Sequence, residues 1–476
     1  MDNGLAARNG GRVGLAALVV ILLLGLGLRL GEAWDGRAPV YDAKAYAAIA
    51  ANLDAGEGFT VGPQATQPSS NYSPGLPLLV AGVYEVSGGV HERFARVVLA
   101  VIGALSVLFA YLIGRRLGRP TTAESERLVS LPAYSKANSP TVVPALLGAL
   151  VVAIYPALLE YQGMLMGEPL AAALLSGGVL ALLWAWEGGW VRWQLPGALF
   201  GALALVRPEY LAVAGLVAVV VFAGEVQVDW RRSLLRAAVF LGAVLVVIAP
   251  WTIRNAVALD RFVPISTGGG QVLFAGTYLP SDGDPEKVGA EVVARHPELF
   301  APDAAQQLRL EQILARLAGH RYPELETDQA LSKMGKEQFW DDVSEEPLEY
   351  AGFVAAKIGR IWSHGPRAVM REPVWEALHW ALIALGLLGL AVLAWRRRWE
   401  ALLLGTIFLA ITAISALLVA SPRRVLVLVP LLAALASVGI AWISTALRSP
   451  SDFRPTPLWR KSDGLTDQRP DSLSRP

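Results

Sequence analysis

The sequence predicts an all-α integral membrane protein, built as a polytopic helical bundle of about ten spans with a large extracytoplasmic loop segment. Three observations predict this class. The 476 residues are 54% hydrophobic and 17% charged, whereas soluble domains carry about 25% charged residues. Apolar runs of about 18 residues, long enough to cross a bilayer, recur along the whole length. Arginine clusters separate several of these runs, as the excess of basic residues in cytoplasmic loops predicts.

The composition also argues against several classes of function. A net charge of +1 disfavours nucleic acid as a partner. The chain has no cysteine, so it holds neither a disulfide framework nor a thiolate metal site. No two histidines are spaced as in a zinc motif. Asp282 and Asp284 have the D-x-D spacing of a divalent metal site, but they lie in a loop where Asp is an ordinary turn former. We therefore expect no metal and no other cofactor.

The first apolar run, residues 13–30, is longer than the roughly 7–15-residue core of a signal peptide. We expect it to be a retained first helix. Arg8 and Arg12 precede it, which predicts a cytoplasmic N-terminus.

The next stretch, residues 40–53, is alanine-rich and predicts a short helix. Asp42 and Tyr46 lie four positions apart, so they share one face with the apolar residues further along. If this helix lies at a membrane surface, the carboxylate of Asp42 is held beside the lipid boundary. The alternative is that Asp42 only caps the helix.

Further spans follow in order along the chain. The apolar piece after Pro77 is too short to cross the membrane, so we expect this piece to lie in the interface. The stretch from Pro120 to Pro140 is expected to be a cytoplasmic loop between the second and third spans. The expected spans outside the stretch 197–224 are residues 96–114, 142–155, 168–186, 234–250, 374–395, 402–420 and 425–447.

The apolar stretch at residues 197–224 decides the topology. As one helix it would extend roughly 42 Å, too long for a single straight crossing. Arg207-Pro208 lies near its middle, and proline interrupts a helix. Two short helices joined at Arg207 also return Arg231 and Arg232 to the cytoplasm, as the positive-inside tendency prefers. We therefore expect a hairpin with Arg207 at its outer tip.

These boundaries divide the chain into four parts. Residues 1–252 form an N-terminal transmembrane catalytic core with a first extracytoplasmic loop at 31–92. Residues 253–373 form an extracytoplasmic segment, in which amphipathic helices are expected at 303–317 and 348–363. The remaining parts are C-terminal transmembrane helices at 374–447 and a cytoplasmic disordered tail at 448–476.

This topology gathers ionisable groups at one membrane boundary. Scattered interfacial arginines are more often headgroup anchors, yet Arg207 and Arg254 each adjoin an apolar segment, where an anionic ligand would favour them. The planar fork of arginine suits phosphate. Carboxylates could take a proton from an incoming hydroxyl while arginines neutralise a departing lipid phosphate. The groups at this boundary are Asp42, Glu160, Glu168, Arg96, Arg207, Arg254, Arg423 and Arg424.

Seven short motifs follow one another in order within a region of roughly residues 13–447. They are Asp42-x-x-x-Tyr46; Tyr72-Ser73-Pro74-Gly75-Leu76-Pro77; Tyr155-Pro156 with Glu168-Pro169; Leu205-Val206-Arg207-Pro208-Glu209; Pro250-Trp251-Thr252-Ile253-Arg254-Asn255; Ser266-Thr267-Gly268-Gly269-Gly270; and Arg423-Arg424. Together they resemble the GT-C membrane glycosyltransferases. The branch they resemble is the protein O-mannosyltransferase-related one, which includes the lipid A aminoarabinose transferase and the RgtA/B/C/D-like enzymes.

The resemblance implies a GT-C bundle that moves a hexose or pentose from a polyprenyl-phosphate donor by inverting displacement. It implies that Asp42 is the base and that Glu168 is the second acid, with Glu160 left open as the alternative. Protein mannosyltransferases carry two adjacent acids in the first loop, whereas Ala43 follows Asp42 here, so a lipid, glycan or protein acceptor remains open. Substrate contacts are expected from Tyr46, Tyr72, Arg96, Arg207, Arg254, Asn255, Gly269 and Arg423.

We expect a multi-pass protein of the plasma membrane with both termini cytoplasmic and the active site on the extracytoplasmic face. Its partners would be the lipid-linked donor, the acceptor and the bilayer. The alternatives are a lipid-linked sugar transporter or flippase, and a non-catalytic envelope glycan assembly protein. Transporters tend to show internal repeats and ionisable groups near mid-membrane. No repeat is visible here, and the charges cluster at helix ends.

Overall fold

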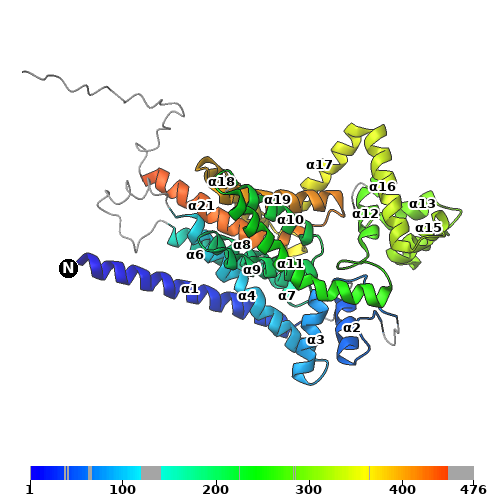
Figure 1. The fold of residues 1–476 in the computed structure, drawn as a ribbon, viewed down its shortest axis with the longest axis horizontal. Coiled ribbons are helices and arrows are strands. Elements are labelled where there is room, and N and C mark those ends of the chain that lie inside the picture. The colour runs from blue at the N-terminus through cyan, green and yellow to red at the C-terminus, as the bar shows by residue number, and fades with distance from the viewer. Residues whose placement is uncertain are drawn as a thin grey trace, which may run out of the picture.

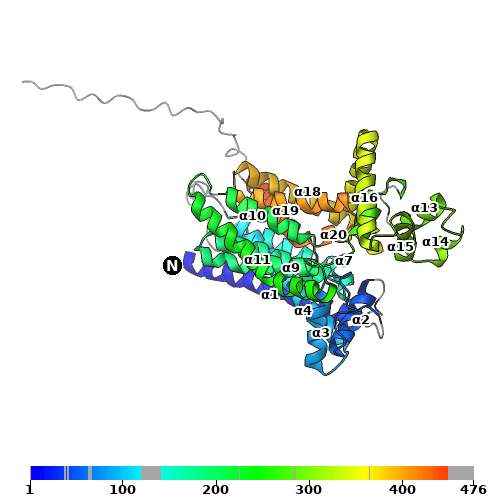
Figure 2. The same ribbon diagram turned by 45° about the vertical axis from the view of Figure 1, so that its right-hand side comes forward.

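The computed structural model describes residues 2–36, 39, 42–62, 67–119, 141–224, 226–281, 284, 286–363 and 365–448. Regular structure in these residues is helical, and none of them lies in a strand. Long helices run side by side as a bundle, with the N-terminus at one end (Figures 1 and 2). The predicted all-α membrane class is confirmed.

Seven described helices are long and apolar enough to cross a membrane. An eighth candidate is a broken span, in which α6 (Val142–Ile154) and α7 (Pro156–Gln162) meet at an angle of 45°. The seven are α1 (Asp2–Trp34), α4 (Glu92–Leu117), α8 (Glu168–Trp186), α11 (Trp230–Leu259), α18 (Pro373–Trp395), α19 (Trp399–Leu417) and α21 (Val429–Arg448).

The predicted hairpin at Arg207 is also confirmed. Helices α9 (Gln194–Val206) and α10 (Tyr210–Ala223) both have their far ends beside Trp186, at the end of α8. The Trp193 ring lies 5.8 Å from that of Trp186, and a Cβ on Gly224 would come within 2.3 Å of Trp186. Arg207, between the two helices, instead contacts Glu168 at the opposite end of α8. Each arm is only about 20 Å long, which is why neither qualifies as a full span by length.

A buried arginine stabilises the break between α6 and α7. The Val152 carbonyl would accept a hydrogen bond from residue 156 in a continuous helix, but Pro156 has no N–H. Arg29 of α1 is 1% exposed and donates to the carbonyls of Val152 at 3.0 Å and Ala153 at 3.1 Å. A membrane-embedded charge is therefore used to satisfy the carbonyls of a broken helix.

Two further groups of helices cover the end of the bundle opposite the N-terminus (Figure 1). Helices α2 (Asp42–Asp54) and α3 (Gly75–Ser87) pack against each other there. The second group lies between α11 and α18 in the sequence, and all of its helices but the last share a separate apolar core. It comprises α12 (Gly269–Thr277), α13 (Val288–Arg295), α14 (Ala304–Gln307), α15 (Leu310–Arg321), α16 (Thr327–Glu345) and α17 (Pro347–Ser363).

The helices expected in this second group are found only in part. The amphipathic helix expected at 348–363 is α17, and the one expected at 303–317 is divided between α14 and α15. Helix α16 was not expected. Helix α11 continues to Leu259, past the expected domain boundary at residue 252. The tail expected to be disordered lies almost wholly outside the described residues.

Candidate active site

A buried carboxylate, Glu168, forms the centre of a charge network at the end of the bundle. Glu168 is the first residue of α8 and is 0% exposed. Its Oε1 accepts hydrogen bonds from Arg207 Nη2 and Arg423 Nε, both at 2.8 Å. Arg207 stands in the break between α9 and α10, and Arg423 begins the short helix α20 (Arg423–Leu426). Three distant parts of the chain therefore meet on one oxygen atom.

Asp42 joins this network through Arg423. Its Oδ2 accepts from Arg423 Nη1 at 3.2 Å and Nη2 at 3.3 Å. The Asp42 side chain is 43% exposed and that of Arg423 is 33% exposed, whereas the Glu168 side chain is 1% exposed. Asp42 is the first residue of α2 and its carboxylate is engaged with Arg423. The accessible members of the network are therefore one acid and one guanidinium.

Glu209 and Arg424 close the network into a ring; Arg424 was expected among the charged groups at this boundary, whereas Glu209 had no assigned role. Glu209 Oε1 accepts from Arg207 Nη1 and from Arg424 Nη1, each at 3.3 Å. Arg424 follows Arg423 directly, so the chain itself joins the two ends. Burial raises the pKa of Glu209, but Arg207 and Arg424 outweigh it and hold that pKa below its ordinary value. Both residues stood in the quoted motifs, and no signal in the sequence showed that they meet.

Tyrosine side chains lie beside the network. Tyr46 and Tyr72 make an edge-to-face contact with ring centroids 5.7 Å apart. Burial, reinforced by the negative charges of Asp42 and Glu168, raises the pKa of Tyr46, so its hydroxyl keeps its proton and can donate a hydrogen bond. Tyr161 of α7 lies within 6 Å of two guanidinium carbons, those of Arg423 at 5.8 Å and Arg367 at 5.7 Å.

The two candidates for the second acid have different partners. Glu168 contacts Arg423, which also binds Asp42. Glu160 instead forms an ion pair with Arg367. The structure therefore places Glu168 in the same network as Asp42 and places Glu160 beside it.

The other expected substrate residues contact other parts of the protein. Arg96 pairs with Glu92 and donates to the Ala33 carbonyl. Asn255 is fully buried and donates to the carbonyls of Val263 and Ile265. Their substrate contacts stay a prediction.

Gly269 begins α12 next to Gly268, which has a φ of 90° that favours glycine. The backbone N–H groups of Gly268 and Gly270 each donate to Asp328 Oδ1 at 2.9 Å. The glycine turn therefore closes on a carboxylate of α16. A contact between Gly269 and substrate stays a prediction.

Arg254 holds the first loop onto α11. Its guanidinium donates to the carbonyls of Ser69 at 2.9 Å and Phe59 at 3.3 Å, and it lies 4.9 Å from the Trp251 ring. We expect Arg254→Ala to increase proteolysis of the loop at residues 57–62, because it removes both contacts. Limited proteolysis in detergent measures this, with exposed Arg295→Ala as the control. Unchanged cleavage together with a weakened affinity for donor would instead assign Arg254 to substrate binding.

Lys357 is a buried cation that the sequence interpretation missed. It lies on α17, is 0% exposed, and donates from Nζ to the Gly276 carbonyl of α12 at 2.5 Å. Burial, together with the charges of Arg360 and Arg424, lowers its pKa from 10.5 to about 7. Its only sequence signal is its position on the apolar face of an amphipathic helix.

The titration of Lys357 predicts a pH dependence of stability. Between about pH 7 and 10.5, the unfolded chain binds a proton that the folded chain does not. Stability should therefore rise with pH in that window, by at most about 1.4 kcal/mol per pH unit. Unfolding free energies of wild type and Lys357→Met at several pH values test this. The difference between the two should grow with pH, whereas exposed Lys336→Met should leave the slope unchanged. Equal slopes for wild type and Lys357→Met would contradict the prediction.

Among the described residues, no three His, Asp or Glu side chains gather as a metal site would require. Asp284 Oδ1 accepts from the backbone N–H of Glu286 at 3.0 Å. Asp282 lies outside the described residues, so the expectation of no metal at this loop stays a prediction.

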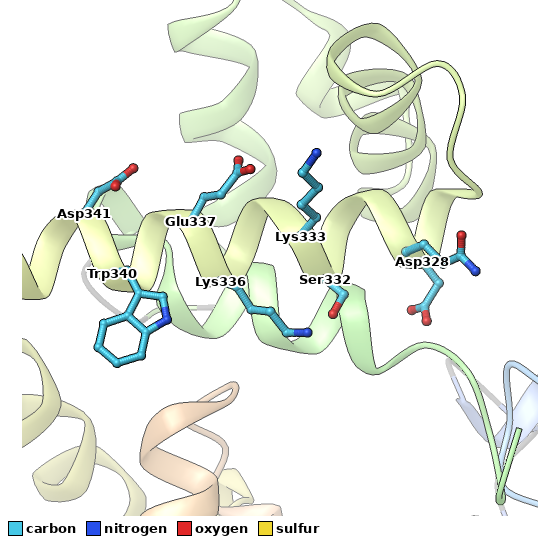
Figure 3. Close-up of a pocket in the computed structure, with 8 residues that line it drawn as sticks. Asp328, Ser332, Lys333, Lys336, Glu337, Trp340 and Asp341 are labelled. Carbon is cyan, nitrogen blue, oxygen red and sulfur yellow. The ribbon is translucent and has the colours of Figure 1, made fainter.

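One surface depression lies away from the charge network. It has a volume of about 740 Å³ and is lined by residues of α16 alone. In Figure 3, Lys333 and Glu337 point to one side of that helix, and Lys336 and Trp340 point to the other. A single helix cannot enclose a ligand, so we place the candidate site at the charge network.

No protein-family model and no curated protein matches the sequence. Solved structures match the fold. The archaeal oligosaccharyltransferase AglB from Archaeoglobus fulgidus, in complex with an inhibitory peptide and a dolichol-phosphate, aligns with 93% of this chain at 16% identity and a TM-score of 0.52. AglB tethered to an acceptor peptide aligns with 93% at 17% identity and a TM-score of 0.52. The chain therefore shares the fold of AglB across its membrane bundle.

This chain spans about half the length of those AglB chains, 52% and 51% respectively. ArnT from Cupriavidus metallidurans bound to undecaprenyl phosphate aligns with 90% of this chain and 79% of its own, at 16% identity and a TM-score of 0.40. That score is too low to support an argument. The AglB match confirms the polytopic helical bundle expected from the sequence.

Proposed function

We propose that the protein is a membrane glycosyltransferase that moves a sugar from a polyprenyl-phosphate donor to an acceptor hydroxyl. One observation carries the proposal: the accessible pair Asp42–Arg423 is backed by the buried Glu168–Arg207 pair. An acid that can take a proton thus lies beside a cation that can hold a phosphate. The shared fold with AglB, whose structure contains a dolichol-phosphate, supports a lipid-phosphate donor.

The reaction assigned to these groups is one displacement. The acceptor oxygen forms a bond to the anomeric carbon while the bond from that carbon to the phosphate oxygen breaks, with inversion. Asp42 takes the acceptor proton. The bonding electrons leave with the polyprenyl phosphate, whose new negative charge is stabilised by Arg423. Glu168 and Arg207 do not touch the reacting atoms in this assignment, and they position Arg423.

The charges of the network fit this displacement. Arg207, Arg423 and Arg424 balance Asp42, Glu168 and Glu209. A donor phosphodiester adds one negative charge. During transfer, Asp42 becomes neutral as the phosphate gains a charge, so the total charge is unchanged. A negative charge simply moves from Asp42 toward the guanidinium of Arg423, which avoids creating a new charge in a partly buried site.

Sugar transfer by the purified full-length protein tests the proposal. A panel of polyprenyl-phosphate hexoses and pentoses is incubated with the protein and an envelope extract in detergent. We expect release of polyprenyl phosphate that depends on acceptor and is lost in Asp42→Asn. A transporter or a non-catalytic assembly protein would release none with any donor.

We also propose that the charge network faces away from the cytoplasm, because the basic clusters favour cytoplasmic placement of the opposite helix ends. The chain has no cysteine, so a single introduced thiol reports sidedness. Ser344 is exposed on α16, and Ser344→Cys should react with an impermeant thiol reagent in intact cells or spheroplasts. Thr412→Cys, inside α19, is the matched control and should not react. Labelling of Ser344→Cys only after lysis would reverse the orientation.

A further inference from the structure

All three guanidinium nitrogens of Arg423 are occupied by carboxylates. Nε donates to Glu168 Oε1 at 2.8 Å. Nη1 and Nη2 donate to the same oxygen of Asp42, at 3.2 and 3.3 Å. Phosphate oxygens favour the same guanidinium fork that carboxylates do. In the free protein, Asp42 therefore occupies the two Nη atoms of Arg423 to which an incoming phosphate would bind.

Only the Asp42 side of this arrangement is open to a ligand. Asp42 and Arg423 side chains are 43% and 33% exposed, whereas Glu168 is 1% exposed and Arg207 14%. Glu168 is also shared between two guanidinium groups, so its displacement would leave both of them unpaired. Exposed ion pairs such as Asp42–Arg423 are weak by comparison. Asp42 is therefore the member of the network that an anion can replace.

We propose that the donor phosphate displaces Asp42 from Arg423, and that this exchange frees Asp42 to take the acceptor proton. The inference rests on the proposed function and adds an order to it, with donor before acceptor. In the free protein, Arg423 holds Asp42. Once phosphate occupies the two Nη atoms, the carboxylate is available to the acceptor hydroxyl.

The exchange requires only a side-chain rotation. Helix α2 is held against α11 by Ile49, which is 0% exposed and lies in one apolar cluster with Trp251. Tyr46 adds the ring contact with Tyr72. The backbone of α2 can stay in place while the short side chain of Asp42, its first residue, changes rotamer.

Binding of farnesyl phosphate to the full chain in detergent tests the exchange without any sugar transfer. If wild type must release Asp42 before phosphate binds, Asp42→Asn should bind this probe more tightly. We expect a gain of about three- to tenfold, because the variant removes both the competing carboxylate and its repulsion of phosphate. Asp42→Ser, which also suits a helix start, should show the same gain.

Two controls make the comparison specific. Asp54→Asn changes the same residue type on the same helix, about 18 Å away, and should leave the affinity unchanged. Farnesol, which lacks the phosphate, should bind wild type and Asp42→Asn equally.

Equal or weaker binding of farnesyl phosphate by Asp42→Asn and Asp42→Ser would overturn the exchange. A protein that transfers sugar but shows no gain in affinity keeps the proposed function and rejects the exchange. A protein that shows the gain but transfers no sugar keeps the exchange and rejects the proposed function.

Discussion

Asp42→Asn should lower the rate of sugar transfer by about 10²–10⁴-fold, the range typical for loss of a general base. Asparagine keeps the size of the side chain but cannot accept the proton. It also starts a helix about as well as aspartate does, so the variant should fold normally. Initial rates at saturating donor measure the effect, and the melting temperature checks the fold.

The control for this variant is Asp54→Asn, at the opposite end of the same helix and exposed. It should retain the wild-type rate. Glu160→Gln tests the neighbouring acid, which pairs with Arg367, and should lose less activity than Asp42→Asn. A fully active, well-expressed Asp42→Asn protein would reduce Asp42 to a residue that starts a helix.

Glu168→Leu should lower the free energy of unfolding by about 3–5 kcal/mol, the usual effect of removing one partner from a buried ion pair. The variant leaves the guanidinium groups of Arg207 and Arg423 facing each other without the oxygen that both now bind. Glu168→Gln should lose less, because its amide oxygen can still accept hydrogen bonds. Unfolding in detergent, followed by circular dichroism, measures both variants.

The matched control is Glu187→Leu, just past the other end of α8. Glu187 pairs with Arg116 but its side chain is 59% exposed, so the change should be below about 1 kcal/mol. If Glu168→Leu were no less stable than Glu187→Leu, the ring would have no structural role. Activity adds a second readout: Glu168→Gln should lose transfer, but less than Asp42→Asn, because it acts through Arg423.

Hydropathy determined the membrane helices because a lipid-embedded helix needs an uninterrupted apolar run whose ends are marked by polar residues. The run expected at 374–395 is α18, Pro373–Trp395, and the run at 402–420 overlaps α19, Trp399–Leu417. The hairpin at Arg207 was predicted from the length of the apolar stretch at residues 197–224 together with Pro208. Arg207-Pro208 interrupts the helix wherever it is placed, because the proline lacks an N–H and restricts the residue before it.

The sequence by itself therefore determined the class and the apolar helices of the bundle, and it predicted that Asp42, Glu168, Arg207 and Arg423 lie at one end of them. Residues expected at the same membrane boundary share a depth, but the sequence does not determine where each of them lies laterally in the bundle. Asp42 and Arg423 are 381 positions apart, and only the packing of the bundle brings them together. The same limit hid Glu209 and Lys357.

The tertiary structure also decided what each arginine binds. In the sequence, Arg254 beside an apolar helix has the same pattern as Arg207. In the fold, Arg254 donates to the carbonyls of Ser69 and Phe59, while Arg207 pairs with Glu168. Every backbone carbonyl is a potential partner for a guanidinium group, and a sequence does not specify which carbonyls remain unpaired near it. The carbonyl partners of each guanidinium group are fixed only when the loops fold over the end of the bundle.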